Sequence, residues 1–388
     1  MPTMPSSIDS IRVTMIDALV GNDYSVCLCS ALYALGVNVE LIAPDNRIVS
    51  MPVDYPIRHW MPTKDAKGSK IGKTLHYLGY LARLIVHVVK HNKEKRIVHF
   101  QFLRRERIES LLFPLMRLLG VNLVFTAHNV LPHENSRVDY FFRFIVYRSA
   151  KVIIVHSEYI KNKLVKGFRI DREKVRVIPH GNFDHYVPKE PMSKSEARAI
   201  LNLSKMENVA LFFGFIREYK GLDQLMDAYE ICVGRGRPWI LVVAGAVHPL
   251  ELESHYRGRI KQISADGSIV FHADFIRSEK VAAYFFACDV VILPYKEIDH
   301  SGIVHLAYSF GRPVIATNVG DFSEVIEDGK SGYLLRENSA ECLSETILGA
   351  FSNSTRLDDM GNYARKLSVS KYSWLEISKK TRELYQSC

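Results

Sequence analysis

The sequence has no apolar run of the roughly 18 residues that a membrane-spanning helix needs. The nearest stretch, residues 81–89, is short and contains Arg83 and His87. The opening residues MPTMPSSIDS lack the basic start and apolar centre of a signal peptide. The six cysteines are scattered, without the spacing of a zinc site or a disulfide framework. We therefore expect a reduced, cytoplasmic protein.

The sequence also lacks low-complexity tracts, tandem repeats and the GxGxxG fingerprint of dinucleotide-binding proteins. A hydride-transferring enzyme is therefore disfavoured. The chain has 388 residues, of which 47% are hydrophobic and 24% charged, and it is too long for one ordinary core. Its length and composition fit two α/β domains.

Short β-branched runs alternate with helical patterns along the whole chain, which predicts parallel sheets with connecting helices. In the first half we expect strands at 12–16, 37–43, 97–102, 122–126, 151–156 and 175–179, with helices at 24–35, 75–89, 107–119 and 136–148. In the second half we expect strands at 209–213, 239–244, 269–272, 290–294 and 313–317, with helices at 222–233, 279–287, 303–310 and 340–351.

A stretch of prolines and polar residues at 179–193 indicates a linker between two domains. We place the first domain at 1–185, the second at 200–368 and a helical tail at 369–388. Two doubly wound domains in tandem predict ligand binding at the carboxyl ends of the strands, in a cleft between the domains.

The net charge of +9 is unevenly distributed. Residues 58–107 contain thirteen lysines and arginines but only three acids. This excess favours a polyanionic partner, which is an acidic lipid, a nucleic acid or a phosphorylated substrate. The apolar helical stretch 75–89 lies inside the basic region, a combination that fits peripheral contact with a membrane. The alternative is a core helix flanked by solvated charges.

The segment LFFGFIREYKG, residues 211–221, has the pattern of a strand, a tight turn and a helix start. Gly214 ends the apolar run, and Arg217 and Lys220 follow in the turn. Open α/β sheets bind ligands at such strand ends, and these two side chains suit an anionic group. Two solvated surface cations are the alternative.

Two further loops of the second half follow predicted strands. Ser301-Gly302 precedes an apolar helix that begins at Ile303, and free amides at a helix start favour a phosphate. An N-terminal cap without a ligand has the same pattern. Phe275 follows the strand at 269–272 and can meet a base through its ring, although a phenylalanine taken alone is more typical of a core.

In the first half, Gly21 and Asn22 follow the first strand. The segment AHNVLPHE places His128, Asn129 and His133 after another strand, where a histidine can bind a ligand or act as a base. We expect no metal, because the segment offers no third acidic ligand. His180 ends the last strand and lines a hinge or forms a structural turn.

Six segments together resemble family 4 glycosyltransferases of the GT-B fold. They are VFTAHNVLPHE, KVIIVHSEYIKNKL, VRVIPHGN, LFFGFIREYKGLDQL, CDVVILPYKEIDHSGIVHLAYSFGRPVIATNVGDFSEVIEDGKSGYLL and YSWLEISKKTRELY. The resemblance implies two Rossmann-like domains, with the acceptor bound by the first and a nucleotide-sugar donor, UDP- or GDP-linked, bound by the second. It also implies that the C-terminal helix crosses back to the first domain.

The resemblance further implies roles for individual residues. Arg217 and Lys220 would hold the donor diphosphate together with the amides of Gly302 and Ile303, and His128 would face the reacting sugar. The loop of Gly21 and Asn22 would close beneath the sugar, and Gly214, Phe275, Glu297 and Ser301 would border the donor. Asn129, His133 and His180 would lie on the acceptor side. Such enzymes typically retain configuration and need neither a metal nor another cofactor.

The chain departs from the family at one position pair. Two glutamates, eight residues apart, often contact the donor, but the corresponding positions here are Ile298 and Leu306. Glu297 and His305 have the same spacing one residue earlier, which turns a helical side chain by about 100°. We expect a subfamily variant in which Glu297 still approaches the donor.

Three other functions compete with glycosyl transfer to a glycan or lipid-linked saccharide. A nucleotide-sugar epimerase would use the same fold, and a non-catalytic protein that binds a nucleotide or a glycan would explain the missing glutamates. Nucleic-acid binding would explain the basic region, but no stacking platform or known module supports it, and we do not expect it.

Overall fold

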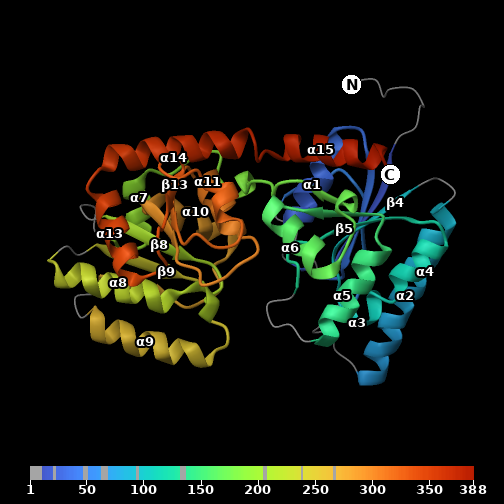
Figure 1. Ribbon diagram of the computed structural model, residues 1–388, viewed down its shortest axis with the longest axis horizontal. Coiled ribbons are helices and arrows are strands. Elements are labelled where there is room, and N and C mark those ends of the chain that lie inside the picture. The colour runs from blue at the N-terminus through green and yellow to red at the C-terminus, as the bar shows by residue number, and fades with distance from the viewer. Residues whose placement is uncertain are drawn as a thin grey trace. The chain divides into compact units, whose positions relative to one another are not determined.

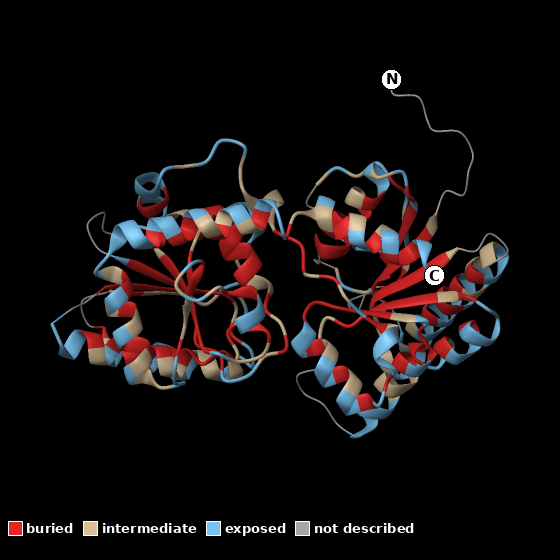
Figure 2. Cartoon of the chain, turned by 45° about the horizontal axis from the view of Figure 1, so that its top comes forward, coloured by how far each residue is buried: buried red, intermediate tan, exposed pale blue. Residues whose placement is uncertain are grey.

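The computed structural model describes residues 11–20, 23–46, 51–62, 69–92, 96–131, 137–203, 208–236, 239–264 and 268–388. Backbone contacts divide the chain into two compact units (Figure 1). Unit 1 contains the described residues up to Gly181 together with Trp374–Cys388, and unit 2 contains Asn182–Ser373. In each unit the inner strands are buried and the outward faces of the helices are exposed (Figure 2).

Unit 1 is built on a seven-stranded parallel sheet with the order β3-β2-β1-β4-β5-β6-β7. The strands are β1 (Arg12–Asp17), β2 (Asn38–Pro44), β3 (Ile57–Met61), β4 (Ile97–Phe102), β5 (Asn122–Thr126), β6 (Val152–Val155) and β7 (Val175–Val177). The inner strands are buried on both faces, as their nearly continuous apolar runs require.

Helices cover both faces of this sheet. One core lies under α1 (Asp23–Ala34) and α15 (Trp374–Gln386). The other lies under α2 (Lys70–Asn92), α4 (Leu112–Leu118), α5 (Arg137–Ser149) and α6 (Glu158–Phe168). The short helices α3 (Glu106–Glu109) and η1 (Arg172–Lys174) complete the unit.

Unit 2 has a six-stranded parallel sheet with the order β10-β9-β8-β11-β12-β13. The strands are β8 (Val209–Phe213), β9 (Ile240–Ala244), β10 (Ile269–His272), β11 (Val290–Leu293), β12 (Val314–Ala316) and β13 (Gly332–Leu334). The first four begin and end close to the predicted bounds.

The two faces of the second sheet also have separate cores. One includes α7 (Lys194–Ile200), α10 (Ser278–Ala287), α11 (Gly302–Ser309) and α12 (Phe322–Val325), and the other includes α8 (Leu222–Gly234), α9 (Glu251–Ile263) and α13 (Ala340–Phe351). The helix α14 (Ser354–Val369) contributes to both, and η2 (Asp184–Tyr186) and η3 (Glu218–Lys220) are short turns. The predicted fold class, with two doubly wound units and a C-terminal helix in the first, is confirmed.

Three details of the sequence prediction were wrong. The edge strands β3 and β13 were not predicted, since an edge strand is short and part of its side chains are exposed. The single helix expected at 107–119 is divided into α3 and α4. Pro114 explains the division, because inside a continuous helix it would lack the bond to the carbonyl of Ser110 and clash with it.

Candidate active site

The turn after β8 rests directly on the loop after β11. Gly214 has φ of +94° and begins the turn, and Gly221 has φ of +70° and ends it before α8. A Cβ atom on Gly221 would lie 1.9 Å from the carbonyl oxygen of Pro294. Only glycine fits this approach, so the two strand ends are held together by backbone contact.

Lys220 is a buried cation in this turn. Its side chain is 8% exposed, and its ammonium has no hydrogen-bond or carboxylate partner in the described part of the chain. Burial, followed by repulsion from Arg217, lowers the pKa of Lys220 to about 8. The ammonium lies 5.5 Å from the centre of the Tyr295 ring. Because a buried charge without a counter-charge is costly, this arrangement indicates an anion site.

The start of α11 lies close to Gly214 and the ammonium of Lys220. A Cβ atom built on Gly214 would lie 3.4 Å from Nζ of Lys220 and 3.3 Å from Cδ1 of Ile303. The Ser301 side chain does not cap the helix, and no acidic residue occupies its first turn. The start of α11 therefore lies near the lysine, and the first turn of the helix contains no acidic residue.

Arg217 adds a second cation. It precedes η3 and is half-buried, and its guanidinium forms no hydrogen bond or ion pair with the residues that the structure describes. The structure thus brings together four of the predicted donor-site residues, Gly214, Lys220, Gly302 and Ile303, and places Arg217 three residues from Lys220.

Phe275 is not a core residue, so the expectation based on its residue type alone was wrong. It is 69% exposed and lies beyond the end of β10. Its ring centre is 6.2 Å from that of Phe215, which is 52% exposed and directly follows Gly214. Two exposed rings, one after β8 and one after β10 on the two sides of β9, offer a stacking surface for a planar group.

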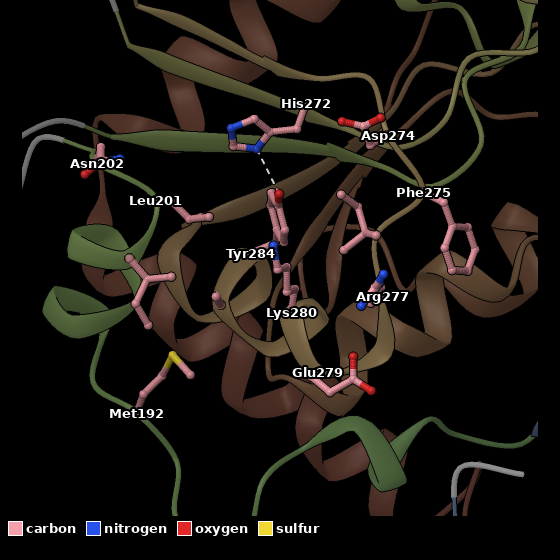
Figure 3. Close-up of a pocket in the computed structure, with 13 residues that line it drawn as sticks. Met192, Leu201, Asn202, His272, Asp274, Phe275, Arg277, Glu279, Lys280 and Tyr284 are labelled. Carbon is pink, nitrogen blue, oxygen red and sulfur yellow. Dashed lines mark hydrogen bonds between the residues drawn. The ribbon is translucent and has the colours of Figure 1, made fainter.

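A pocket of about 460 Å³ borders Phe275. In Figure 3 the ring of Phe275 lies at one end, and Asn202 and Met192 lie at the other. Between them, Tyr284 donates a hydrogen bond of 2.8 Å to Nδ1 of His272, or accepts one from it, depending on the histidine tautomer. The rim of charged side chains comes from the loop after β10 and the first turns of α10.

Ile298 and Leu306, at the two positions where the family often has glutamates, are packed into unit 2. Leu306 is buried in a core of unit 2, and Ile298 packs against that core. Glu297 is exposed on the loop after β11, whereas His305 is buried, with its ring 4.5 Å from that of Tyr372. The structure therefore gives Leu306 and Ile298 packing roles.

In unit 1, His128 is the centre of a hydrogen-bonded chain. Its Nδ1 lies 3.0 Å from Nε2 of His156, whose Nδ1 lies 3.0 Å from the carbonyl oxygen of Ile178. That carbonyl requires a proton on Nδ1 of His156, so Nε2 of a neutral His156 accepts from His128. On the other side, Nε2 of His128 lies 3.0 Å from Oε1 of Gln101, which accepts a hydrogen bond when that nitrogen carries a proton. The ring also stacks on Phe102 at 4.4 Å, and these contacts fix its orientation.

The remaining predicted residues of unit 1 are less informative. Nδ1 of the buried His180 contacts the carbonyl oxygen of Gly181 at 2.6 Å, and its ring packs on Tyr24. Asn129 is half-buried beside His128. Gly21, Asn22 and His133 lie outside the described residues.

Sequence reasoning missed several residues of these clusters. Phe215 lies inside the quoted turn, and its place directly after the turn glycine was a usable signal. Gln101 lies in β4 and His156 directly follows β6, and their approach to His128 depends on the order of strands in the sheet. No pattern in the sequence indicates that order.

Two doubly wound units, with Lys220 and Arg217 at the strand ends of the second, have the architecture of the GT-B fold. The chain resembles sucrose-phosphate synthase from Thermosynechococcus elongatus with a TM-score of 0.76 at 18% identity, over 97% of this chain and 99% of the other. The Anabaena protein HepE, solved with UDP-glucose, has a TM-score of 0.75 at 16% identity over 97% and 100%. These likenesses show the fold.

The sequence comparisons show the family. Residues 193–367 match the model of group 1 glycosyl transferases, and residues 23–182 match that of Glycosyltransferase Family 4. D-inositol 3-phosphate glycosyltransferase from an Arthrobacter species is 26% identical over 94% of this chain and 89% of its own. Alpha-maltose-1-phosphate synthase from Mycolicibacterium smegmatis is 24% identical over 69% and 74%. The chain belongs to the family 4 type of glycosyltransferases.

Proposed function

We propose that this enzyme transfers a sugar from a nucleoside-diphosphate sugar, with UDP or GDP as the carrier, to a glycan or a lipid-linked saccharide in polysaccharide or glycoconjugate synthesis. The observation that carries the proposal is the buried ammonium of Lys220 beside Gly214 and the start of α11, for which the described residues supply no carboxylate or hydrogen-bond partner. The HepE structures with UDP and UDP-glucose support a donor of this class.

The proposed reaction breaks the bond between the sugar and the donor phosphate and forms a bond from the sugar to an acceptor hydroxyl. The acceptor proton passes to the leaving phosphate, and the configuration at the sugar is retained. Negative charge grows on the departing diphosphate, so Arg217, Lys220 and the amides of Gly302 and Ile303 stabilise it most in the transition state. This chemistry requires neither a metal nor a protein nucleophile.

The other predicted residues take their roles in this proposal from the family resemblance. His128 faces the reacting sugar, while Gly21 and Asn22 close beneath it, and Ser301 and Glu297 border the donor. Phe275 borders the donor, and its ring pair with Phe215 adds the proposal that both stack on the nucleotide base. Asn129, His133 and His180 contact the acceptor.

Nucleotide-dependent stabilisation tests the donor site. The melting temperature is measured with UDP, GDP, ADP and their sugar conjugates, with and without EDTA. A nucleotide at 100 times its dissociation constant adds about 2.7 kcal/mol to the free energy of unfolding. We expect stabilisation by one nucleotide series, unchanged in EDTA, absent in Lys220→Ala and kept in Lys330→Ala, which removes an exposed lysine.

A shift with no nucleotide, or an equal shift in both variants, would contradict the proposal. Nucleotide binding without turnover on any tested acceptor would instead favour a non-catalytic binding protein, which the apolar residues Ile298 and Leu306 make the second candidate. Isomerisation of the nucleotide sugar without acceptor would identify an epimerase.

We further infer that unit 1 contacts an anionic membrane, which places the enzyme in the cytoplasm at the inner face of that membrane. The described part of the chain contains no helix that is long and apolar enough to span a bilayer. The helix α2 instead has two apolar faces. One is buried in unit 1 through Tyr77, Tyr80, Leu81, Leu84 and Val88, and the other is exposed through Ile71, Leu75, Leu78, Val86 and Val89.

The exposed residues form a stripe, because a rotation of about 100° per residue keeps these five positions within a sector of roughly 80°. Arg83 and Lys90 are exposed on the same helix. An apolar stripe with a cationic border is complementary to an anionic lipid surface.

Vesicle sedimentation tests this contact. We expect binding to phosphatidylcholine vesicles that contain phosphatidylglycerol, weaker binding at high salt, and loss of binding in Leu75→Glu combined with Val86→Glu. Leu250→Glu, which changes an exposed leucine of unit 2, should bind normally. Absence of binding, or equal binding by both variants, would contradict membrane contact.

A further inference from the structure

The loop between β11 and α11, residues 294–301, leads directly to the amides of Gly302 and Ile303. The segment after β12, residues 317–321, lies along this loop. Oγ1 of Thr317 donates a hydrogen bond of 2.7 Å to the carbonyl oxygen of Tyr295. A Cβ atom on Gly320, which has φ of +60°, would lie 2.2 Å from the carbonyl oxygen of Ile298. The two segments are therefore in backbone contact at the loop's centre.

A third contact lies at the end of the loop. Nδ1 of His300 is 2.7 Å from Oδ2 of Asp321, and the two side chains are 7% and 1% exposed. A carboxylate only accepts hydrogen bonds, so Nδ1 of His300 carries the proton. A buried carboxylate is costly without a partner, which makes the histidine a strong restraint on the loop. Ser301 and the first amides of α11 follow immediately.

We propose that Asp321 is a positioning residue for the donor diphosphate. Through His300 it fixes the end of the β11–α11 loop, so that the amides of Gly302 and Ile303 stay directed at the diphosphate beside Lys220. The inference rests on the proposed function. It differs from a general role in stability, because it predicts a loss confined to ligands that carry phosphate.

The test compares nucleotides with nucleosides. Dissociation constants are measured for UDP, GDP and ADP and for uridine, guanosine and adenosine, in the wild type, Asp321→Ala, His300→Ala and the double variant. For the series that the wild type binds, we expect each single variant to weaken diphosphate binding about tenfold, the scale of one hydrogen bond to a charged group. Nucleoside binding should not change.

The double variant should lose no more than either single variant, because both remove the same contact. His300→Asn keeps an N–H group near the place of Nδ1 and should restore most of the affinity. If Asp321→Ala does not fold, Asp321→Asn and His300→Asn carry the test. Asp321→Asn should then bind the diphosphate more weakly than His300→Asn.

Asp289→Ala is the matched control. Asp289 precedes the same strand, β11, at its opposite end, and it accepts hydrogen bonds from Lys194 at 2.6 Å and Arg198 at 2.9 Å. This variant should lower the melting temperature while leaving the ratio of diphosphate to nucleoside affinity unchanged.

Equal weakening of nucleoside and diphosphate binding in Asp321→Ala, or additive losses in the double variant, would overturn the positioning role. A wild type that binds no nucleotide would instead overturn the proposed function. The two failures are therefore distinguishable in one set of titrations.

Discussion

Glu40 in unit 1 and Lys220 in unit 2 are both buried charges, but their surroundings differ. Glu40 contacts Arg58 at 2.5 Å, His87 at 2.6 Å and Arg96 at 2.7 Å, and it accepts a hydrogen bond from Thr14. Lys220 has no such partner in the described part of the chain. Burial raises the pKa of Glu40, but the hydrogen bonds from His87, Arg58 and Thr14 outweigh it and lower the pKa to about 2.

The difference separates a structural charge from a binding charge. The partners of Glu40 are supplied by the protein itself, so its interactions contribute to the folded state in the absence of any ligand. The described residues supply no partner for Lys220, so in our proposal the cost of its burial is offset only when an anion binds. Four predictions test this comparison.

The largest effect is expected for Glu40→Ala. Removal of one partner from a buried ion cluster leaves uncompensated cations, which costs about 3–5 kcal/mol of unfolding free energy. Denaturant unfolding measures the loss, and Glu173→Ala removes an exposed ion pair as a control. Because the folded pKa of about 2 lies below the ordinary 4.5, wild-type stability should fall as the pH drops through this interval, and the variant should lack that component. Unchanged stability would contradict the structural role.

Lys220→Met should reduce activity without reducing the stability of the ligand-free protein. The loss of one preorganised cation lowers transition-state stabilisation by about 2–4 kcal/mol, measured as kcat/KM. The melting temperature of the ligand-free protein should stay the same or rise, because an uncompensated buried charge has been removed. A marked fall in that melting temperature would show that Lys220 also holds the fold together.

A smaller effect is expected for the aromatic pair. Phe275→Ala and Phe215→Ala should each weaken nucleotide binding by about 1–3 kcal/mol, the usual range for stacking of a base on a ring. Because both side chains are largely exposed, the unfolding free energy should hardly change. Calorimetric titration gives the affinities, and Val233→Ala changes an exposed apolar residue of the same unit as a control. Full affinity in both aromatic variants would remove the stacking role.

The smallest effect is a dependence on pH. The pKa of Lys220 is lowered to about 8, so the ammonium of the ligand-free protein loses its proton above that pH. A bound diphosphate would keep the ammonium of Lys220 protonated. Nucleoside diphosphate affinity should therefore fall as the pH rises above 8, and Lys220→Arg should bind with little change over the same range. The stability of the ligand-free protein should change in the opposite direction. It should rise between pH 8 and the ordinary pKa of 10.5, because the buried ammonium loses its charge over this range.

Much of the fold followed from the alternation of buried strands and helices, because inner parallel strands have strong apolar runs. The turn cations were also predictable, since Arg217 and Lys220 directly follow such a run. The burial of Lys220 and the exposure of Phe275 were not, because each depends on what the neighbouring strand ends cover. The contact of His300 with Asp321 joins residues 21 positions apart across two loops, and no local pattern specifies it.

The place of α15 in unit 1 has a consequence for the order of events during synthesis. Ile377, Leu384 and Tyr385 belong to a core of unit 1, and the Tyr385 hydroxyl lies 2.6 Å from Nδ1 of the buried His99. A ribosome makes all of unit 2 before it reaches these residues. The nascent first unit therefore keeps part of one sheet face uncovered while the second unit emerges and folds, and the part of the protein begun first is completed last.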